Sequence, residues 1–222
     1  MALSMNIVER LEALDVCAVS DAKDSLGLPP AISGLARQSG EGLLAGRVRT
    51  VELVEGTPSA DIPKVHLCAR AIISSTTETV IVVAHPGIDA GGWGGVLSTG
   101  AQLAGVRGVV LDGPTRDRDE AVGLGFPIFA KGNTAKTARG RVYERATGEP
   151  IEIDGQRVED GDFVIADGAG VVFISAAEAE RVIAAAERIV RKEKAMVASL
   201  RDGNPITEVM GADYETMLED NK

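Results

Sequence analysis

The sequence contains few aromatic side chains, cysteines and histidines. Of its 222 residues one is Trp, two are Tyr and four are Phe, which makes 3% aromatics. The core must therefore be built from Ala, Val, Ile and Leu, and such an aliphatic, glycine-rich core suits α/β layers better than a β-sandwich. The two cysteines, Cys17 and Cys68, make no disulfide framework and lie in no CxxC pattern. We expect both to be buried as small apolar residues.

The chain also has no excess of positive charge and no long apolar run. Its formal net charge is −10, which disfavours nucleic-acid binding as a primary role because phosphate backbones attract cations. No apolar run reaches the length of a membrane span. Residues 1–15 have the pattern of an amphipathic helix with acidic positions, unlike a signal peptide, and we expect a cytoplasmic chain.

Hydrophobic periodicity predicts alternating helices and strands along the first 132 residues. Ser20 and Asp21 are typical helix-start residues, and Gly27 is typical of the end of that helix. The run 79–85 is apolar on both faces, as parallel strands tend to be. The expected helices cover residues 6–15, 20–27, 62–74, 96–105 and about 118–125, and the expected strands cover residues 43–55, 79–85, 108–112 and 127–131.

Beyond residue 132 the pattern changes to short strands. Asp154–Gly155 and Asp167–Gly168 are hairpin turn signals. A long helix of about 176–200 follows, and an acidic tail ends the chain. The helix has an apolar stripe that we expect to pack on the body or on a neighbouring subunit. The stripe consists of Val182, Ile183, Ala186, Ile189, Val190, Val197 and Leu200. We predict a single α/β domain over residues 1–222.

The stretch GGWGGVLSTG, residues 91–100, places glycines between a strand and a helix. It fits neither the dinucleotide fingerprint nor the phosphate-binding loop of nucleotide hydrolases. Free N–H groups at a helix N-terminus favour an anion, so a carboxylate or phosphate could bind the amides of Gly95, Val96 and Leu97. The alternative is a tight turn in which Trp93 fills a gap. Spacing by itself slightly favours the turn.

The stretch DGPTRDRDE, residues 112–120, lies at the carboxyl edge of the expected strand 108–112, where open α/β folds bind ligands. Arg116 can hold a carboxylate or enolate with two hydrogen bonds. Asp117 can ligate a Mg²⁺ ion that keeps most of its waters. The alternative is a capping box, in which Asp117 caps a helix together with Glu120 and Arg116 is a surface charge.

The remaining polar motifs give weaker signals. The two histidines do not have zinc-ligand spacing. His85 follows a strand near the glycine loop and is a candidate for a polar role, although a structural histidine is the commoner case. Neither a Ser/His/Asp elbow nor a nucleophilic lysine is indicated.

The two motifs together resemble the RraA-like family. The resemblance rests on Gly94-Gly95-Val96-Leu97 followed at fixed distance by Arg116-Asp117-x-x-Glu120, and it extends to residues 19–27, 125–132 and 158–175. The family includes the divalent-metal 4-hydroxy-4-methyl-2-oxoglutarate / 4-carboxy-4-hydroxy-2-oxoadipate aldolases and the RraA regulators of ribonuclease E. It implies a three-layer β/β/α swivelling-type fold and a trimer or hexamer with active sites at subunit interfaces.

The resemblance also implies roles for the motif residues. The amides of Gly94, Gly95, Val96 and Leu97 would hold a pyruvyl carboxylate, Arg116 would contact the keto or enolate oxygen, and Asp117 would ligate Mg²⁺ or Mn²⁺. A divalent ion is a Lewis acid for the charge that develops when a bond next to a 2-oxo acid breaks. Arg116 and the amides would add preorganised electrostatic stabilisation. We therefore expect a metal-dependent lyase, either an aldolase or an oxaloacetate decarboxylase.

Two positions depart from the family pattern. Many of its aldolases carry Asp or Glu before the apolar pair, where this chain has Gly95. The strand before the loop usually ends in Asp, whereas here it ends in His85. Either the substrate differs or His85 supplies acid–base function. Asp21 is a further candidate contributor, and the pocket for the distal group of the substrate is expected to come from a neighbouring subunit.

The alternative function within the family is a protein-binding regulator of ribonuclease activity without catalysis. The acidic surface would suit a basic partner. The acid at Asp117, which the regulators often lack, favours an enzyme. A methyltransferase, a name also attached to this family, receives little weight because the chain has no glycine motif for S-adenosylmethionine.

Overall fold

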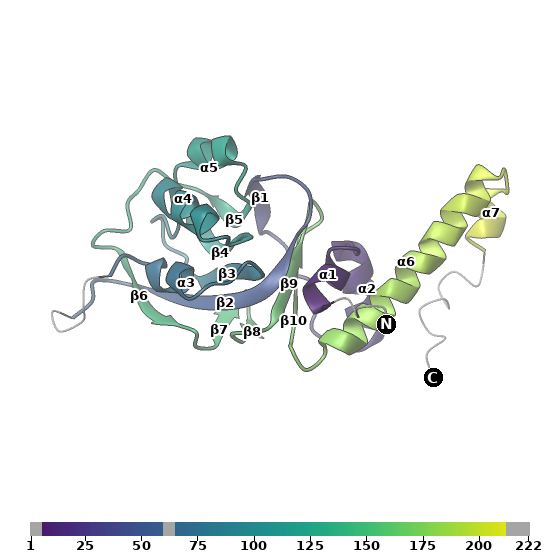
Figure 1. The fold of residues 1–222 in the computed structure, drawn as a ribbon, viewed down its shortest axis with the longest axis horizontal. Coiled ribbons are helices and arrows are strands. Elements are labelled where there is room, and N and C mark those ends of the chain that lie inside the picture. The colour runs from purple at the N-terminus through teal and green to yellow at the C-terminus, as the bar shows by residue number, and fades with distance from the viewer. Residues whose placement is uncertain (1–5, 60–64, 212–222) are drawn as a thin grey trace.

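The computed structural model describes residues 6–59 and 65–211 (Figure 1). Three parts of the predicted elements lie outside these residues: the first five residues of the amphipathic segment, residues 62–64 of the predicted helix 62–74, and the acidic tail after residue 211. No helix in the described ranges is both long and apolar enough to cross a membrane.

One mixed sheet of eight strands organises the molecule. Its centre is parallel, because β2 pairs with β3, β3 with β4, and β4 with β5 in the same direction. The four parallel strands are β2 (Leu44–Glu55), β3 (Thr79–Ala84), β4 (Gly108–Thr115) and β5 (Ile128–Asn133). The antiparallel neighbours are β1 (Ala36–Ser39) on β5, β9 (Phe163–Ala166) and β6 (Val142–Thr147) on β2, and β10 (Val171–Ile174) on β9.

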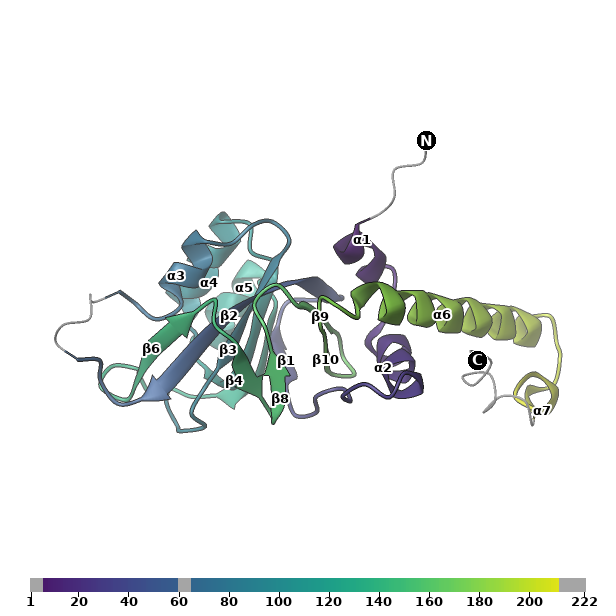
Figure 2. The same ribbon diagram turned by 90° about the horizontal axis from the view of Figure 1, so that it is seen from below.

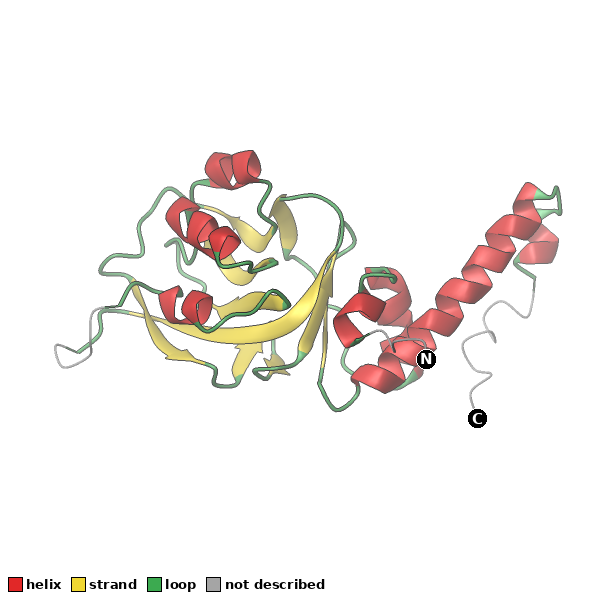
Figure 3. Ribbon diagram, viewed as in Figure 1, coloured by secondary structure: helices red, strands yellow, loops and turns green. Residues whose placement is uncertain are grey.

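Layers cover both faces of the sheet, so the central strand β3 is apolar apart from Thr79. All six residues of β3 are buried. Ile81 and Val83 face helices α3 (Ala69–Ile73), α4 (Gly95–Leu103) and α5 (Arg118–Leu124). Val80 and Val82 lie on the opposite face with the hairpin β7 (Ile151–Ile153) and β8 (Gln156–Val158). Figures 1 and 3 show these helices and this hairpin on opposite sides of the sheet, as the predicted three-layer β/β/α fold requires.

A group of helices packs at the β9–β10 end of the sheet. It consists of α1 (Ile7–Leu11), α2 (Val16–Ser25) and α6 (Ala179–Arg201), with the short α7 (Ile206–Val209) after it. Figure 2 shows α6 leaving the body as a straight arm. The first half of its predicted apolar stripe is buried, whereas Val197 in the second half is 44% exposed. The stripe therefore packs on the body only near its beginning.

Several predicted boundaries are wrong for identifiable reasons. Helix α2 begins at Val16, because the Asp15 side chain accepts a hydrogen bond from the Ala18 amide and caps it, so Ser20 and Asp21 lie inside the helix. Of the predicted helix 62–74, the described part is helical only in Ala69–Ile73, because Cys68 has a left-handed backbone with φ 64°.

The cysteines, the two Asp-Gly turns and the length of β4 bear on further predictions. Cys68 is fully buried as predicted, whereas Cys17 is exposed and that prediction is wrong. The Asp154–Gly155 turn joins β7 to β8, and the Asp167–Gly168 turn lies between β9 and β10, so both predicted hairpins are confirmed. The predicted strand 108–112 is too short, since β4 continues to Thr115. This extension brings the second motif to the first.

Candidate functional site

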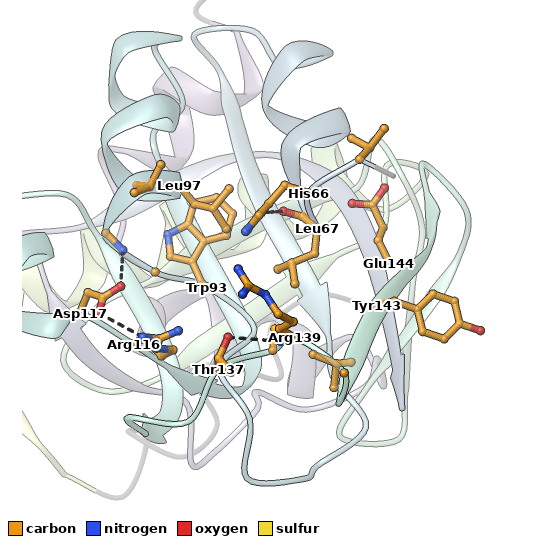
Figure 4. A pocket seen from close by; sticks show the side chains of 18 of the residues that line it. His66, Leu67, Trp93, Leu97, Arg116, Asp117, Thr137, Arg139, Tyr143 and Glu144 are labelled. Atoms are coloured by element: carbon orange, nitrogen blue, oxygen red, sulfur yellow. Dashed lines mark hydrogen bonds and ion pairs between the residues drawn. The ribbon is translucent and has the colours of Figure 1, made fainter. Parts of the chain in front are cut away.

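A cavity of about 570 Å³ opens where the glycine loop, the end of β4 and strand β6 meet (Figure 4). Its size is that of ordinary small-molecule pockets. All six residues to which the motif analysis gave primary roles line it: Gly94, Gly95, Val96, Leu97, Arg116 and Asp117.

The two motifs form one unit because the glycine loop pairs with the end of β4. Trp93 and Thr115 form a parallel bridge. The Gly92 amide donates to the Pro114 carbonyl at 3.0 Å, and the Arg116 amide donates to the Trp93 carbonyl at 2.9 Å. The fold thus fixes the loop before α4 against the residues that follow β4.

Trp93 anchors the loop in the core. Its side chain is 2% exposed and stacks on Phe126 with ring centroids 6.3 Å apart. Its indole Nε1 donates to the Ser98 hydroxyl at 2.9 Å, which satisfies the one polar atom of the ring. The gap-filling role suggested for Trp93 is therefore correct, and the loop it anchors also lines the cavity.

Asp117 connects the two helices at the site. Its backbone is left-handed, with φ 54°, a strained conformation for a residue other than glycine. It occupies the cap position of α5 but makes no side-chain cap bond there. Its Oδ2 instead accepts from the Gly95 amide at the start of α4, at 3.1 Å. The suggested capping box between Asp117 and Glu120 is therefore wrong.

Glu120 fills the space that a side chain at residue 95 would need. A Cβ atom added to Gly95 would lie 1.8 Å from Glu120 Oε2, and one added to Gly94 would lie 2.9 Å from Asp117 Oδ2. Two carboxylates therefore meet the backbone of Gly94 and Gly95. The negative charge that the family resemblance leads one to expect at residue 95 is supplied here from α5.

The N-terminus of α4 retains free donors. Gly94 caps the helix without a side-chain bond, and the Gly95 amide is used by Asp117. In the described part of the chain no acceptor is recorded for the amides of Val96 and Leu97. These two N–H groups, at the positive end of the helix dipole, can bind an anion.

Arg116 has unused hydrogen-bonding capacity beside these amides. Its Nε is buried and finds no hydrogen-bond partner within the described residues. Its nearest carboxylate oxygen is Asp117 Oδ1, at 4.0 Å from a terminal nitrogen. The side chain passes directly over Gly91, where an added Cβ would lie 2.4 Å from Arg116 Cγ. Glycine at position 91 therefore makes room for the arginine.

Two other candidates lie away from the cavity lining. His85 is 8% exposed and packs on Gly113, and its Nδ1 accepts from the Gly87 amide at 3.2 Å. Burial lowers the pKa of His85, so the ring is neutral at pH 7. Asp21 lies on α2 in the separate helix group, where burial and the nearby Asp24 raise the pKa of its carboxyl. Neither residue is among those that line the cavity.

Sequence spacing missed the opposite wall of the cavity, which includes His66, Arg139 and Glu144. Glu144 is committed to structure: it accepts from the Cys68 amide at 2.6 Å and pairs with Arg70 at 3.0 Å. Glu144 reaches the site through the antiparallel pairing of β6 with β2, whereas Arg139 lies on the loop before β6 and His66 just before α3. No local motif indicates that these segments meet.

The donor set suits a weakly caged divalent ion. Across residues 6–59 and 65–211, no three His, Cys, Asp or Glu side chains converge as a metal cage. Mg²⁺ needs no such cage, since it keeps several waters and binds through one or two carboxylates. Asp117, with its partly exposed carboxylate on the cavity, and Glu120 beside Gly95 fit that requirement.

The fold is mixed α/β, and its cavity lies between an arginine and the N-terminus of α4. The chain belongs to the RraA-like family, whose model, described as Aldolase/RraA, matches residues 16–173. A Halalkalibacterium halodurans protein, named provisionally as a 4-hydroxy-4-methyl-2-oxoglutarate aldolase, is 26% identical over 89% of this chain and 90% of its own length.

Solved structures support the same fold. An uncharacterised protein from Pseudomonas syringae pv. tomato superimposes with a TM-score of 0.82 and 26% identity, over 95% of this chain and all of its own. RraAS2 of Streptomyces coelicolor, described as an unusual member of the RNase ES inhibitor RraA family, gives 0.76 and 21%, over 87% of this chain and 96% of its own. The family thus contains proteins named as aldolases and proteins named as ribonuclease inhibitors.

Proposed function

We propose that this chain is a divalent-metal-dependent lyase that cleaves a 2-oxo acid through a pyruvate enolate. Its substrate would be of the 4-hydroxy-4-methyl-2-oxoglutarate type, oxaloacetate, or both. The observation that carries the proposal is the buried, unpartnered Nε of Arg116 beside the free amides of Val96 and Leu97. A buried donor without a partner is costly, and a bound oxyanion would satisfy it.

The amides would hold the substrate carboxylate. Val96 and Leu97 donate at the positive end of α4, where a negative charge is stabilised. Arg116 approaches from β4, on the other side of the loop, and its guanidinium would donate to the keto oxygen. Because the charge on that oxygen grows as the bond breaks, a donor already in place there stabilises the transition state more than the ground state.

Asp117 would hold a Mg²⁺ or Mn²⁺ ion, with water among the remaining ligands. When bound, such an ion supplies Lewis-acid stabilisation of the enolate charge. Asp117 is held in place by its bond to the Gly95 amide, so its second oxygen has a fixed position. Glu120 is not among the residues that line the cavity, but its Oε2 lies beside Gly95, and it would accept or return a proton there.

The reaction needs no redox partner. The bond between C3 and C4 breaks, and its electron pair moves into the C2 carbonyl to give the enolate. In the aldol case the C4 hydroxyl becomes a carbonyl and gives its proton to Glu120, which returns a proton to C3 of the enolate to form pyruvate. In the decarboxylation CO₂ leaves, and the proton that C3 takes comes from solvent.

Replacing Asp117 tests the proposal. We expect the wild-type chain with Mg²⁺ or Mn²⁺ to release pyruvate from oxaloacetate or 4-hydroxy-4-methyl-2-oxoglutarate, and EDTA and Asp117→Ala to abolish that release. Pyruvate is followed with a lactate dehydrogenase couple. Asp119→Ala, which removes a fully exposed acid two residues away, should leave turnover unchanged. Absence of metal-dependent turnover above the spontaneous rate with either acid would contradict the proposal.

A second candidate is a protein-binding regulator of ribonuclease activity. It is favoured by the described role of the Streptomyces coelicolor family and by the net charge of −10, which suits a basic partner surface. This candidate predicts that the chain co-purifies with a ribonuclease or helicase and inhibits RNA cleavage. Arg116→Ala should leave that inhibition intact, whereas the same change should abolish a lyase activity.

A further inference from the structure

The wall of the cavity opposite Arg116 carries two cationic or potentially cationic side chains. Arg139, on the loop between β5 and β6, and His66, just before α3, both line the cavity. In Figure 4 their nitrogen-bearing ends point toward one another across it. Arg139 has no recorded ion-pair partner anywhere in the described ranges, so its charge is available to a ligand.

The loop that bears Arg139 is braced and not loose. Asp89 accepts from Thr134 at 2.6 Å and pairs with Lys136 at 2.6 Å, and the Lys136 carbonyl accepts from the Gly91 amide at 3.0 Å. The last contact ties this loop to the glycine loop of the catalytic end. The two ends of the cavity therefore have a fixed relation to each other.

His66 can act with Arg139 as a donor. Its Nδ1 lies 3.0 Å from the Leu67 carbonyl oxygen, so that nitrogen donates within the protein. An imidazolium then retains its Nε2–H for an anion. The acid on this wall, Glu144, is already neutralised by Arg70 and does not offset the positive charge.

Much of the remaining lining of the cavity is apolar. It includes Leu67, Leu97 and Val142, which suit an aliphatic chain and offer it no hydrogen bonds. A ligand that matches the whole cavity therefore has an anionic group at each end and a short carbon chain between them.

We propose that Arg139 and His66 form a second anion subsite, which binds the distal carboxylate of a dicarboxylic 2-oxo acid. This inference rests on the proposed function for the chemistry at the other end of the cavity. It assigns recognition of the distal group to residues of this chain itself, where the family resemblance had led us to expect a neighbouring subunit.

The kinetic test compares a substrate that has the distal carboxylate with a reactant that lacks it. In Arg139→Gln we expect kcat/KM for oxaloacetate to fall about tenfold or more, mainly through KM, because a charge-assisted hydrogen bond is lost. Exchange of the pyruvate methyl protons with deuterated solvent should be unchanged, since pyruvate has no distal carboxylate. His66→Asn should give a smaller loss of the same kind. Arg157→Gln, at an exposed arginine on β8, is the matched control.

A binding measurement separates this inference from the proposed function. By calorimetry in the presence of Mg²⁺, the wild-type chain should bind 2-oxoglutarate more tightly than the monocarboxylate 2-oxobutanoate, and Arg139→Gln should remove the difference. Equal wild-type affinity for the two acids would overturn the subsite, whatever the turnover. If the wild-type chain prefers 2-oxoglutarate, Arg139→Gln loses that preference, and no 2-oxo acid is turned over, the subsite is supported and the lyase function is overturned.

Discussion

Because Gly95 has no side chain, the carboxylate of Glu120 can lie beside it. The position opens α4, and the space in which a Cβ would project is taken by Glu120 Oε2 at 1.8 Å. That oxygen is at the far end of a flexible side chain, so it would swing aside if the space were filled. A substitution at Gly95 should therefore move the carboxylate without unfolding the protein.

We predict that Gly95→Ala lowers kcat/KM for oxaloacetate about tenfold or more, because it displaces Glu120 from the site. The melting temperature should change little. Gly100→Ala is the control: it lies on the same helix, but an added Cβ there meets no atom within 4 Å. It should retain full activity and be slightly more stable, by about 0.5–1 kcal/mol, because alanine favours the helix. Equal activity of the two variants would exclude a role for the displaced carboxylate.

The sequence placed Arg116 and Asp117 at the cavity but did not give their contacts. Arg116 and Asp117 follow a strand, and that position is enough to place them at a sheet edge. The capping-box pattern then suggested the wrong partner for Asp117, since the carboxylate bonds to α4 and not to α5. A capping pattern concerns residues within one helix, whereas this hydrogen bond joins residues 22 apart in two helices. The pattern could therefore not predict it.

Among the elements, α2 is held on the sheet by a buried charge. Lys23 is 2% exposed, and its ammonium donates to the Phe173 carbonyl of β10. Burial lowers the pKa of Lys23 to about 8 from the ordinary 10.5, because the charged form is poorly solvated there. Between these two pH values the unfolded chain binds more protons than the folded one, so stability rises with pH in that window.

Replacing this lysine should remove the pH dependence. Relative to Lys23→Met, the wild-type free energy of unfolding should increase by about 3 kcal/mol between pH 8 and pH 10.5, as the difference in pKa implies. Urea unfolding at several pH values measures it, and taking the difference between the two chains cancels the other titrating groups. Lys194→Met, at an exposed lysine of α6, should retain the wild-type slope. A slope shared by wild type and Lys23→Met would rule out the buried ammonium as its cause.

Element types were easier to predict than their ends. The run 80–84 is apolar on both faces and forms the buried strand that was predicted, and the two Asp-Gly turns lie in both predicted hairpins. Helix α2 begins four residues before Ser20, because Asp15 caps it. The wall with Arg139 and His66 could not be derived from spacing, because it joins the loop before β6 to the segment before α3, and no local signal indicates that they meet.

The whole molecule exposes apolar side chains on its helical layer. On α4, Val96 is 88% and Leu103 is 85% exposed, and they lie seven residues apart on one helix face. Val96 also lines the cavity. The trimer or hexamer implied by the family resemblance, with active sites at its interfaces, would cover this face.

Light scattering after size exclusion tests the assembly. We expect a mass three or six times the monomer mass of 23.1 kDa for the wild-type chain. Leu103→Glu should lower it, because a charge would then be buried against the partner. Val197→Glu provides the comparison, since it alters the exposed half of the α6 stripe instead. A monomeric wild-type chain would contradict the expectation, and a loss of mass only in Val197→Glu would assign the contact to α6.

Strand β2 connects all parts of the molecule, which affects how the molecule unfolds. It pairs with β3, β6 and β9, and its residues belong to all three hydrophobic clusters, with Ala45 in the first, Val48 in the second and Val51 in the third. Removing it would open the helix group, the hairpin layer and the cavity wall at once. We therefore expect the cavity and the distant helices to unfold in a single cooperative transition, because both lose their support when β2 is lost.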